Sequence, residues 1–331
     1  MEPKIITINH GAGGRLMHEF IHDSIVAHLG NSKLDKMDDS SVLQNYPHKL
    51  PVLTTDSYVV HPVFFSGGDI GRLCVCGTVN DLAASGAEPL ALTLSFILEE
   101  GFELEKLDKI IASIGKTAKE AGVEIVTGDT KVVEKGKGDG IFINTAGLGF
   151  VDPGVSISSH NTLPGDLVLV TGPLGNHEMA LFKDRENMNF QYSVQSDVTP
   201  LNLKVKELLA HTRNIHTIKD PTRGGLASAL TEIAQNSQVR IELEEEKIPV
   251  DKEVKAMCDL VGFDPLYLAN EGKYIIVCPP EETPKVKAAF GSETTVIGQV
   301  EKGQPDLILN TASGGNRRLI MMENIQLPRI C

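Results

Sequence analysis

The sequence lacks a long apolar run, and this absence argues against a membrane-spanning protein. No stretch approaches the roughly 18 consecutive apolar residues that cross a bilayer as a helix. The first four residues, Met-Glu-Pro-Lys, carry no basic region followed by an apolar stretch, so export is not expected either. With 331 residues and 41% hydrophobic content, the chain is expected to be a soluble protein of two domains, without a membrane partner.

Cysteine is scarce, and its spacing excludes two kinds of small stabilised domain. The chain has five cysteines, an odd number, and no two of them form a Cys-x-x-Cys pair. A disulfide framework and a zinc knuckle are therefore not indicated, and a reducing cytoplasm is the expected location. Four of the five, Cys74, Cys76, Cys258 and Cys278, are expected to be small buried side chains.

Basic residues are too few for a protein whose main partner is nucleic acid. The chain has 31 lysines and arginines against 44 aspartates and glutamates, a formal net charge of −13. Phosphate backbones and anionic membranes are held by excess positive charge, so neither is expected. An acidic protein binds a nucleotide by placing divalent metal ions between its carboxylates and the phosphates. The composition therefore predicts aspartates grouped in loops at the ends of strands and helices.

Strand-like and helix-like stretches alternate in two blocks. In the first block, strands are expected at 50–55 and 90–98, and an amphipathic helix over 104–121 stops at a capping glycine. The polar, glycine-rich segment 135–140 lies between two apolar stretches and predicts a hairpin loop. The block closes near 152–154, which reads Asp-Pro-Gly.

The second block repeats the alternation. It is expected to contain strands at 167–171, 274–278 and 294–300 and helices near 201–209, 225–234 and 284–290. The predicted organisation is an N-terminal domain over 1–153, a second α+β domain over 154–310 and a flexible tail over 311–331.

The chain ends on a thiol, Cys331. The segment 311–315, Thr-Ala-Ser-Gly-Gly, reads as a flexible hinge, which would place this thiol on a swinging arm. Thiolates are good nucleophiles and good leaving groups, as a carrier of a reactive group between sites must be. On position alone a frayed terminus is the better interpretation, and the rest of the sequence changes that balance.

Aspartates recur in predicted loops beside glycine or hydroxyl residues. They are Asp56, Asp69, Asp81, Asp129 and Asp220. Their carboxylates, with the exposed backbone N–H groups of such loops, could reach a metal-bound polyphosphate. Each one alone is more often a turn residue or a helix cap. Five in one chain favour a nucleotide site.

The familiar nucleotide-binding motifs are incomplete in this sequence. The segment 113–117, Ser-Ile-Gly-Lys-Thr, ends like a P-loop but lacks the first glycine and lies in an amphipathic helix. The segment 10–16 lacks the last glycine of a dinucleotide fingerprint. Its Gly13 and Gly14, followed by Arg15, still suit a flexible segment that covers a phosphate.

One run is specific enough to indicate a family. The segment 81–89 reads Asp-x4-Gly-Ala-x-Pro and resembles a motif of the ATP-binding superfamily that includes aminoimidazole ribonucleotide synthetase, selenophosphate synthetase and thiamine-monophosphate kinase. Within it, the chain is similar to the HypE family of hydrogenase maturation proteins, and the terminal Pro-Arg-Ile-Cys is the feature that selects this family. The matching segments span nearly the whole chain and are 55–57, 65–71, 76–82, 128–133, 220–226, 268–273 and 328–331.

The resemblance implies an ATP-dependent carbamoyl dehydratase. Members of the family receive a carbamoyl group on the terminal cysteine from a HypF-type carbamoyltransferase and use ATP to dehydrate it to a thiocyanate. The thiocyanate supplies cyanide ligands for the iron of nickel-iron hydrogenase, which a HypC–HypD type scaffold carries. Carried onto this sequence, the catalytic residues are Cys331 as the acceptor, Glu271 as a proton acceptor and Lys131 as a stabiliser of developing negative charge.

The resemblance also implies ATP and Mg²⁺ as cofactors. The acids expected to hold the metal are Asp56, Asp81, Asp129 and Asp220. The residues expected to bind the nucleotide are Gly13, Gly14, Asp56, Asp69, Asn80, Asp81, Asp129, Thr130, Asp220, Thr222 and Asn270.

The expected fold, again by resemblance, is the α+β, two-domain PurM-like fold with the nucleotide between the domains. A homodimer would join the two N-terminal sheets into a β-barrel. One segment departs from the family, because 175–178 reads Gly-Asn-His-Glu where Gly-Asp-His-Gly is common. This loop is therefore excluded from the predicted metal site, and His177 is expected to be structural or hydrogen-bonded near the tail.

Two other functions stay open at this point. A small-molecule ATP-dependent kinase or synthetase, such as selenophosphate synthetase, would explain the aspartates and would work without the last four residues. A scaffold whose tail docks on a partner would consume no ATP.

Overall fold

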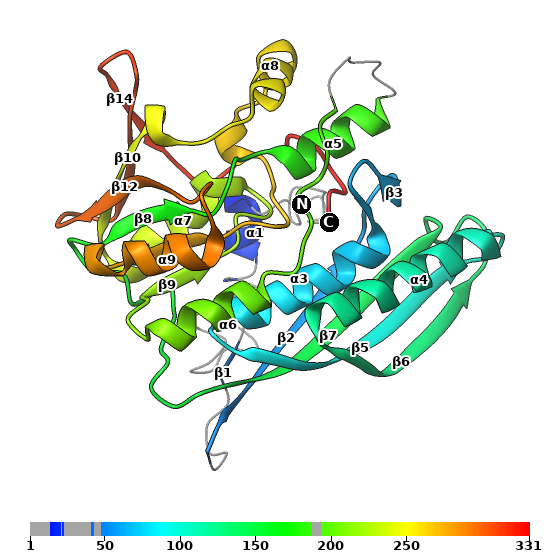
Figure 1. The fold of residues 1–331 in the computed structure, drawn as a ribbon. Coiled ribbons are helices and arrows are strands. Elements are labelled where there is room, and N and C mark those ends of the chain that lie inside the picture. The colour runs from blue at the N-terminus through cyan, green and yellow to red at the C-terminus, as the bar shows by residue number, and fades with distance from the viewer. Residues whose placement is uncertain (1–13, 21, 23–40, 43–47, 187–192) are drawn as a thin grey trace, which may run out of the picture.

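A computed structural model of the chain describes residues 14–20, 22, 41–42, 48–186 and 193–331. Two α+β domains meet along a central helix, α3 (Ile70–Ala84), as Figure 1 shows. Within those residues, no helix is both long enough and apolar enough to cross a bilayer.

The N-terminal domain is built on a five-stranded sheet. In spatial order its strands are β1 (Ser41–Val42), β2 (Leu50–Tyr58), β7 (Ile141–Val151), β5 (Glu88–Glu99) and β6 (Glu124–Val133). The strands expected at 50–55 and 90–98 are confirmed. The hairpin predicted at 135–140 is wrong, because β5 lies between β6 and β7, so the two strands that this loop joins do not pair.

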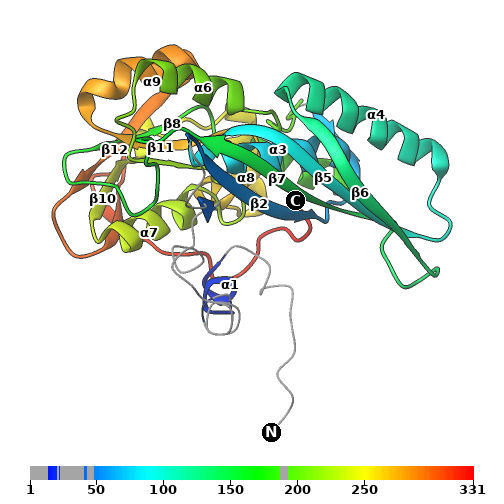
Figure 2. The same cartoon turned by 90° about the horizontal axis from the view of Figure 1, so that it is seen from below.

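Helices cover one face of this sheet. Figure 2 shows α3 and α4 (Leu104–Ala121) on the same side, while no helix of the described chain covers the opposite face. The predicted helix is confirmed, and it ends at Gly122 in the left-handed conformation. Nearly every residue of α3 is buried, because it packs on the sheet, on α4 and on the second domain. Gly77 permits this packing, since a Cβ there would lie 2.4 Å from the Tyr58 hydroxyl oxygen.

Two small elements flank the sheet. A two-stranded ribbon, β3 (Phe64–Phe65) with β4 (Gly68–Asp69), leads into α3. The short helix α1 (Arg15–Phe20) lies near the start of the tail, because Arg15 N–H donates to the Met322 carbonyl oxygen at 2.6 Å.

The second domain is built on a seven-stranded mixed sheet. In spatial order its strands are β14 (Asn316–Leu319), β13 (Asp306–Asn310), β10 (Arg240–Glu244), β12 (Thr295–Glu301), β8 (Leu167–Val170), β11 (Ile275–Cys278) and β9 (Thr217–Lys219). Its α-helices are α5 (Asn176–Arg185), α6 (Asn202–His211), α7 (Gly225–Ser237), α8 (Lys252–Val261) and α9 (Thr283–Phe290).

Strands β8 and β11 are buried on both faces of this sheet. Val168 and Val277 pack in the core beneath α7, and Leu169 and Ile276 pack in the core beneath α6 and α9. Figure 2 shows α7 on one side of the sheet and α6 and α9 on the other. This two-sided burial explains why both strands are continuous apolar runs in the sequence.

The segment 311–315, expected to be a hinge, is the turn of the β13–β14 hairpin. Thr311 N–H donates to the Gly315 carbonyl oxygen at 2.8 Å, and Gly314 has a φ of 86°. Small polar residues with glycine are typical of flexible linkers and of tight turns alike, and here the pairing of the flanking strands decides between them. The tail therefore begins after Leu319.

Candidate active site around the C-terminal tail

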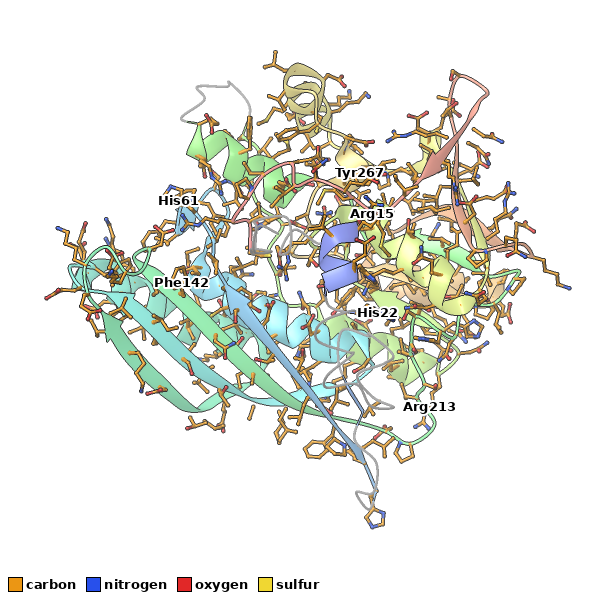
Figure 3. All side chains as sticks on the ribbon, turned by 180° about the vertical axis from the view of Figure 1, so that it is seen from behind. Arg15, His22, His61, Phe142, Arg213 and Tyr267 are labelled. Atoms are coloured by element: carbon orange, nitrogen blue, oxygen red, sulfur yellow. The ribbon has the colours of Figure 1, made fainter. Side chains whose placement is uncertain are left out.

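Residues 320–331 form a tail that runs between the two domains. Figure 3 shows it passing from beside Tyr267 towards His61. Val59 N–H donates to the main-chain oxygen of Cys331 at 3.0 Å, and His61 N–H donates to the Arg329 carbonyl oxygen at 3.2 Å. The side chains of Leu327 and Ile330 are each 5% exposed and belong to the core of the N-terminal domain. The terminus is packed and hydrogen-bonded, which a frayed end would not be.

The terminal thiol faces charged side chains from both domains. Burial raises the pKa of the Cys331 thiol, the Arg223 guanidinium lowers it, and the carboxyl groups of Glu271 and Asp56 raise it further. In this position the sulfur is therefore protonated rather than a thiolate.

Asp56 and Asp81 approach the thiol from the N-terminal domain. Asp56 on β2 pairs in register with Thr145 of β7, a residue with no exposed surface, so both side chains point to the face that α3 covers. Asp81 lies on α3 and accepts a hydrogen bond of 2.9 Å from Thr54 Oγ1, on the same face of β2. Burial raises the pKa of Asp56, and Arg223 opposes that effect.

Glu271 and Asp220 approach from loops of the second domain. The side chain of Glu271 is 5% exposed, and its Oε1 atom is buried without a hydrogen-bond partner in the described structure. Burial raises the pKa of Glu271 well above its usual value, and the carboxyl groups of Asp220, Asp197 and Asp56 raise it further. Glu271 therefore lies close to these acids, with one buried carboxyl oxygen that makes no hydrogen bond in the described structure.

A buried ion pair fixes the backbone of Glu271. Asp197 accepts the N–H of Glu271 at 3.2 Å and the N–H of Gly272 at 3.1 Å, and it pairs with Lys273 Nζ at 2.8 Å. Burial alone would raise the pKa of Asp197, but Lys273 and His177 lower it below its usual value. Asp197 therefore stays ionised and holds the loop that presents Glu271.

The junction between the two domains, where Cys331 lies, has more carboxyl groups than the Arg223 guanidinium can balance. The thiol of Cys331 and the carboxyl groups of Asp56, Glu271 and Asp81 all raise the pKa of Arg223. Among the residues that the structure describes, no three His, Cys, Asp or Glu side chains are close enough to hold a metal ion by themselves. A divalent ion would need phosphate oxygens as well as these carboxylates, and such an all-oxygen donor set fits Mg²⁺.

The structure separates Lys131 and Asp129 from these groups. Across the sheet, Thr145 pairs with Leu94, and Leu94 pairs with Gly128, so Gly128 shares the inner face with Asp56. Side chains alternate along a strand. Asp129 and Lys131 therefore point to the opposite face, where Lys131 Nζ lies 2.6 Å from Asp129 and their side chains are 68% and 58% exposed. Within one chain they do not meet Glu271.

Asp69 has a structural task. It is the N-cap of α3, where its Oδ1 accepts the N–H groups of Gly71 at 2.7 Å and Arg72 at 3.0 Å. Its Oδ2 accepts a hydrogen bond of 2.6 Å from Ser113 Oγ. Both carboxylate oxygens are engaged, so we leave Asp69 out of the nucleotide site.

The two predicted asparagines brace the junction. Asn80 joins α3 to the second domain, because Nδ2 donates to the Thr199 carbonyl oxygen at 3.0 Å and Oδ1 accepts the Leu201 N–H at 2.8 Å. Asn270 accepts the Gly175 N–H at 2.8 Å and donates to the Pro221 carbonyl oxygen at 3.3 Å. Both side chains are buried and position the loops around Glu271.

The remaining predicted nucleotide residues contribute less to this geometry. Gly13 lies outside the described residues, as does the side chain of Thr130. Gly14 packs against the tail, since a Cβ there would lie 1.6 Å from the Met322 carbonyl oxygen. Thr222 lies in the turn between Asp220 and α7, where its carbonyl oxygen accepts the Gly225 N–H at 2.9 Å.

Three residues at this junction were not singled out from the sequence. Arg223 lies in the same Asp-Pro-Thr-Arg-Gly-Gly run as Asp220, so an arginine beside a predicted metal ligand was the available signal. Asp197, and Arg185, which donates to the Pro328 and Arg329 carbonyl oxygens of the tail, had no such signal, because they reach the site only through the folded chain. His177 does bond near the tail as expected, with its Nε2 atom 2.7 Å from the Ile330 carbonyl oxygen.

Comparison with known proteins identifies the family. The model of the AIR synthase related protein, N-terminal domain, matches residues 37–151, and that of the C-terminal domain matches residues 164–310. A carbamoyl dehydratase HypE of Azotobacter vinelandii is 44% identical over 328 residues, covering 97% of this chain and 96% of that protein.

Two solved structures share the fold over nearly the whole chain. The crystal structure of a HypE–HypF complex matches with a TM-score of 0.86 and 43% identity, covering 92% of this chain and 99% of the other. The structure of a hydrogenase maturation protein HypE in complex with ATP matches with a TM-score of 0.83 and 41% identity, covering 99% and 100%. The two-domain PurM-like α+β fold is thereby confirmed, and the chain belongs to the HypE family of the AIR synthase related proteins.

Proposed function

We propose that this protein uses ATP to dehydrate a carbamoyl group on Cys331 to a thiocyanate, which supplies cyanide ligands for the iron of nickel-iron hydrogenase. The observation that carries the proposal is the position of the terminal thiol, which faces Arg223, Glu271 and Asp56 between the two domains. A relative named carbamoyl dehydratase at 44% identity supports the same reaction. Family membership does not favour the alternative of a small-molecule kinase or synthetase.

The reaction must turn an amide oxygen into a leaving group. The carbonyl oxygen of the S-carbamoyl group attacks the γ-phosphorus of ATP, and the bond from that phosphorus to the bridging oxygen breaks to release ADP. The nitrogen loses one proton as the phosphorylated imidate forms. The C–O bond then breaks, phosphate departs, and the nitrogen loses its second proton as the nitrile forms. Carbamoyl thioester and ATP thus give thiocyanate, ADP and phosphate.

Glu271 and Arg223 have the chemistry that these steps require. Glu271 faces the sulfur and accepts a proton from the nitrogen. A carboxylate whose pKa is raised by burial and by neighbouring acids is a stronger base, once ionised, than an exposed one. Arg223 stabilises the negative charge that develops on the transferred phosphoryl group.

Asp56, Asp81 and Asp220 are the residues of this chain that would hold Mg²⁺ together with the nucleotide phosphates. They lie on both sides of the junction, around Arg223 and Glu271. When bound, Mg²⁺ would supply positive charge to the transferring phosphoryl group. The surplus of carboxyl groups at the junction has a direct use in this arrangement.

The tail protects the reacting group from water. Leu327 and Ile330 are buried against the N-terminal core on either side of the bend at Arg329, whose φ is 58°. Water would hydrolyse the phosphorylated imidate, so an apolar plug beside the reacting carbon favours nitrile formation.

The carbamoyl group would be loaded while the tail lies outside, not while it is packed between the two domains. In the inserted position burial keeps the Cys331 thiol protonated, and a thiol is a weak nucleophile. We propose that the tail is loaded outside, on a HypF-type carbamoyltransferase, and later delivers cyanide to a HypC–HypD type scaffold that carries the iron. All five cysteines are free thiols in the structure, in keeping with the cytoplasm as the place of reaction.

We further propose a homodimer formed through the uncovered face of the N-terminal sheet. Leu53 and Ile97 are 45% exposed, and register places them on this face with Phe142 and Leu148. An apolar face of this kind suits burial against a second copy, which would close a β-barrel. Lys131 lies on the same face, so a dimer would bring the Lys131 of one protomer towards the partner.

Intact-mass analysis tests the proposed function. After incubation with a HypF-type donor system and ATP, the mass of the wild-type chain is expected to rise by one carbamoyl group and then to fall by one water. Cys331→Ala is expected to show neither change, whereas Cys258→Ala, which removes a buried thiol, should behave as the wild type. A nitrile on the Cys331→Ala chain would reject the assignment. Turnover of a soluble substrate by a chain without residues 328–331 would favour a small-molecule enzyme instead.

A further inference from the structure

Helix α5 lies between the tail and helix α8. Its Met179 and Ala180 are buried in a cluster with Val254 and Met257 of α8. Three of its polar and charged residues, His177, Glu178 and Arg185, bond to the tail, whereas Asn176 bonds to Asp251 and Asp184 bonds to Ser66. Apolar side chains of α5 therefore pack on α8, while His177, Glu178 and Arg185 of the same helix form hydrogen bonds with the tail.

His177 forms one hydrogen bond with the tail and one with Ser196. Its Nε2 atom lies 2.7 Å from the Ile330 carbonyl oxygen, which can only accept, so Nε2 carries the proton. Its Nδ1 atom lies 2.7 Å from Ser196 Oγ, and Ser196 Oγ accepts the Val198 N–H at 3.2 Å. Burial lowers the pKa of His177, in agreement with a neutral ring that accepts at Nδ1 and donates at Nε2.

Arg185 binds three carbonyl oxygens. Its guanidinium donates to the Pro328 oxygen at 2.6 Å, to the Arg329 oxygen at 2.9 Å and, through Nε, to the His61 oxygen at 3.0 Å. It thereby ties the tail both to α5 and to the loop that follows β2. Hydrogen bonds from an ionised donor are stronger than those between neutral groups.

Glu178 completes the set on the same helix. Its side chain is 3% exposed, and its Oε2 accepts the Ala269 N–H at 2.8 Å. The Leu327 N–H also bonds to this carboxyl group. Glu178 thus joins Leu327, a buried residue of the tail, to the loop that carries Glu271.

These contacts share one property, which is that they involve only main-chain groups of the tail. His177, Glu178 and Arg185 bind N–H or C=O groups of Leu327, Pro328, Arg329 and Ile330 and leave the Cys331 side chain untouched. The same contacts can therefore form whether the sulfur is free, carbamoylated or converted to a thiocyanate.

We propose that His177, Glu178 and Arg185 are positioning residues, which hold the tail inserted during dehydration and set how often Cys331 is presented outside. This inference rests on the proposed function only where it refers to dehydration, because insertion of the tail and exposure of Cys331 can be measured without ATP or a carbamoyl donor. Dehydration needs the inserted tail and loading needs the free one, so weaker contacts should change the two steps in opposite directions.

The first test measures access to the terminal thiol. Cys74, Cys76, Cys258 and Cys278 are at most 1% exposed, so alkylation of the folded chain by iodoacetamide reports on Cys331. Arg185→Ala is expected to speed this alkylation by about tenfold or more, since loss of charge-assisted hydrogen bonds favours local opening. Arg185→Lys, which keeps a charged donor, should lie between the two. Glu186→Ala, at the exposed end of the same helix, should match the wild type.

The second test separates positioning from general damage. In Arg185→Ala, dehydration of the loaded tail with ATP should slow, while transfer of the carbamoyl group from the donor system should be unchanged or faster. Equal losses in both steps would indicate a merely structural role and would overturn the proposal. Wild-type alkylation rates in Arg185→Ala would overturn it as well. If the chain never carries a carbamoyl group, the proposed function fails, yet the alkylation rates still decide whether α5 holds the tail. If Arg185→Ala does not fold, the same comparison is made with Arg185→Lys.

Discussion

Two lysine–aspartate pairs in this chain have nearly equal separations and opposite surroundings. Lys273 Nζ lies 2.8 Å from Asp197, with side chains 8% and 10% exposed, and Lys131 Nζ lies 2.6 Å from Asp129, with side chains 68% and 58% exposed. The buried pair also binds the backbone of Glu271, whereas the exposed pair lies on the open face of a sheet. Burial and further partners, rather than the distance itself, decide what an ion pair does.

The largest effect is expected from breaking the buried pair. Lys273→Met leaves the Asp197 carboxylate buried without its charged partner, which should lower the free energy of unfolding by about 3 kcal/mol. Urea denaturation measures this loss. A loss no larger than that of Lys131→Met would show that burial does not distinguish the two pairs.

Glu178, a buried carboxyl group that forms no ion pair within the described part of the chain, sharpens the comparison. Burial raises the pKa of Glu178 from 4.5 to about 7, although Ala269 N–H and Arg185 oppose this shift. A raised carboxyl pKa means that stability is lost as the pH rises from 4.5 to 7. Glu178→Gln should therefore stabilise the fold at pH 8 by about 3 kcal/mol, given about 1.4 kcal/mol per pKa unit and a shift from 4.5 to about 7.

The pH dependence of the stabilisation by Glu178→Gln serves as the control for this prediction. The difference in unfolding free energy between Glu178→Gln and the wild type should be constant above pH 7 and should shrink towards pH 4.5. A difference that does not vary with pH would show that the Glu178 carboxyl group has an ordinary pKa.

The smallest effect on stability is expected at the exposed pair. Lys131→Met should change the free energy of unfolding by less than about 1 kcal/mol, because solvent screens the pair. Its effect on dehydration should instead depend on the proposed dimer. Mixing inactive Lys131→Met with inactive Glu271→Gln should restore roughly a quarter of the wild-type rate if the two residues act across protomers, since half of the dimers would be mixed and would hold one intact site. If the mixture recovers no activity, Lys131 and Glu271 do not act across protomers.

Local sequence patterns predicted the single elements better than their pairing. The helical spacing from Leu104 and the stop at Gly122 gave α4, because both signals lie within the helix itself. The loops 135–140 and 311–315 are both polar and glycine-rich, and each was assigned wrongly. Their roles depend on which strands pair, and that information lies in residues far along the chain.

The candidate site shows the same division. Asp56, Asp81, Asp220, Glu271 and Cys331 stood out by residue type and motif, and the fold brings them around Arg223. The sequence left open whether Asp69 caps a helix or binds the nucleotide, and it could not reveal that Lys131 faces away from Glu271, because that follows from the orientation of a strand. Glu178 appeared only as a departure from the family pattern, and its contact with the tail depends on the folded chain.

The most direct test follows the loaded tail in the Glu271→Gln variant by intact mass. If Glu271 accepts the proton that leaves the nitrogen, this variant should gain the carbamoyl group as the wild type does and then lose water at least about 100-fold more slowly with ATP. Loss of water at the wild-type rate would contradict the placement of the reacting group beside Glu271.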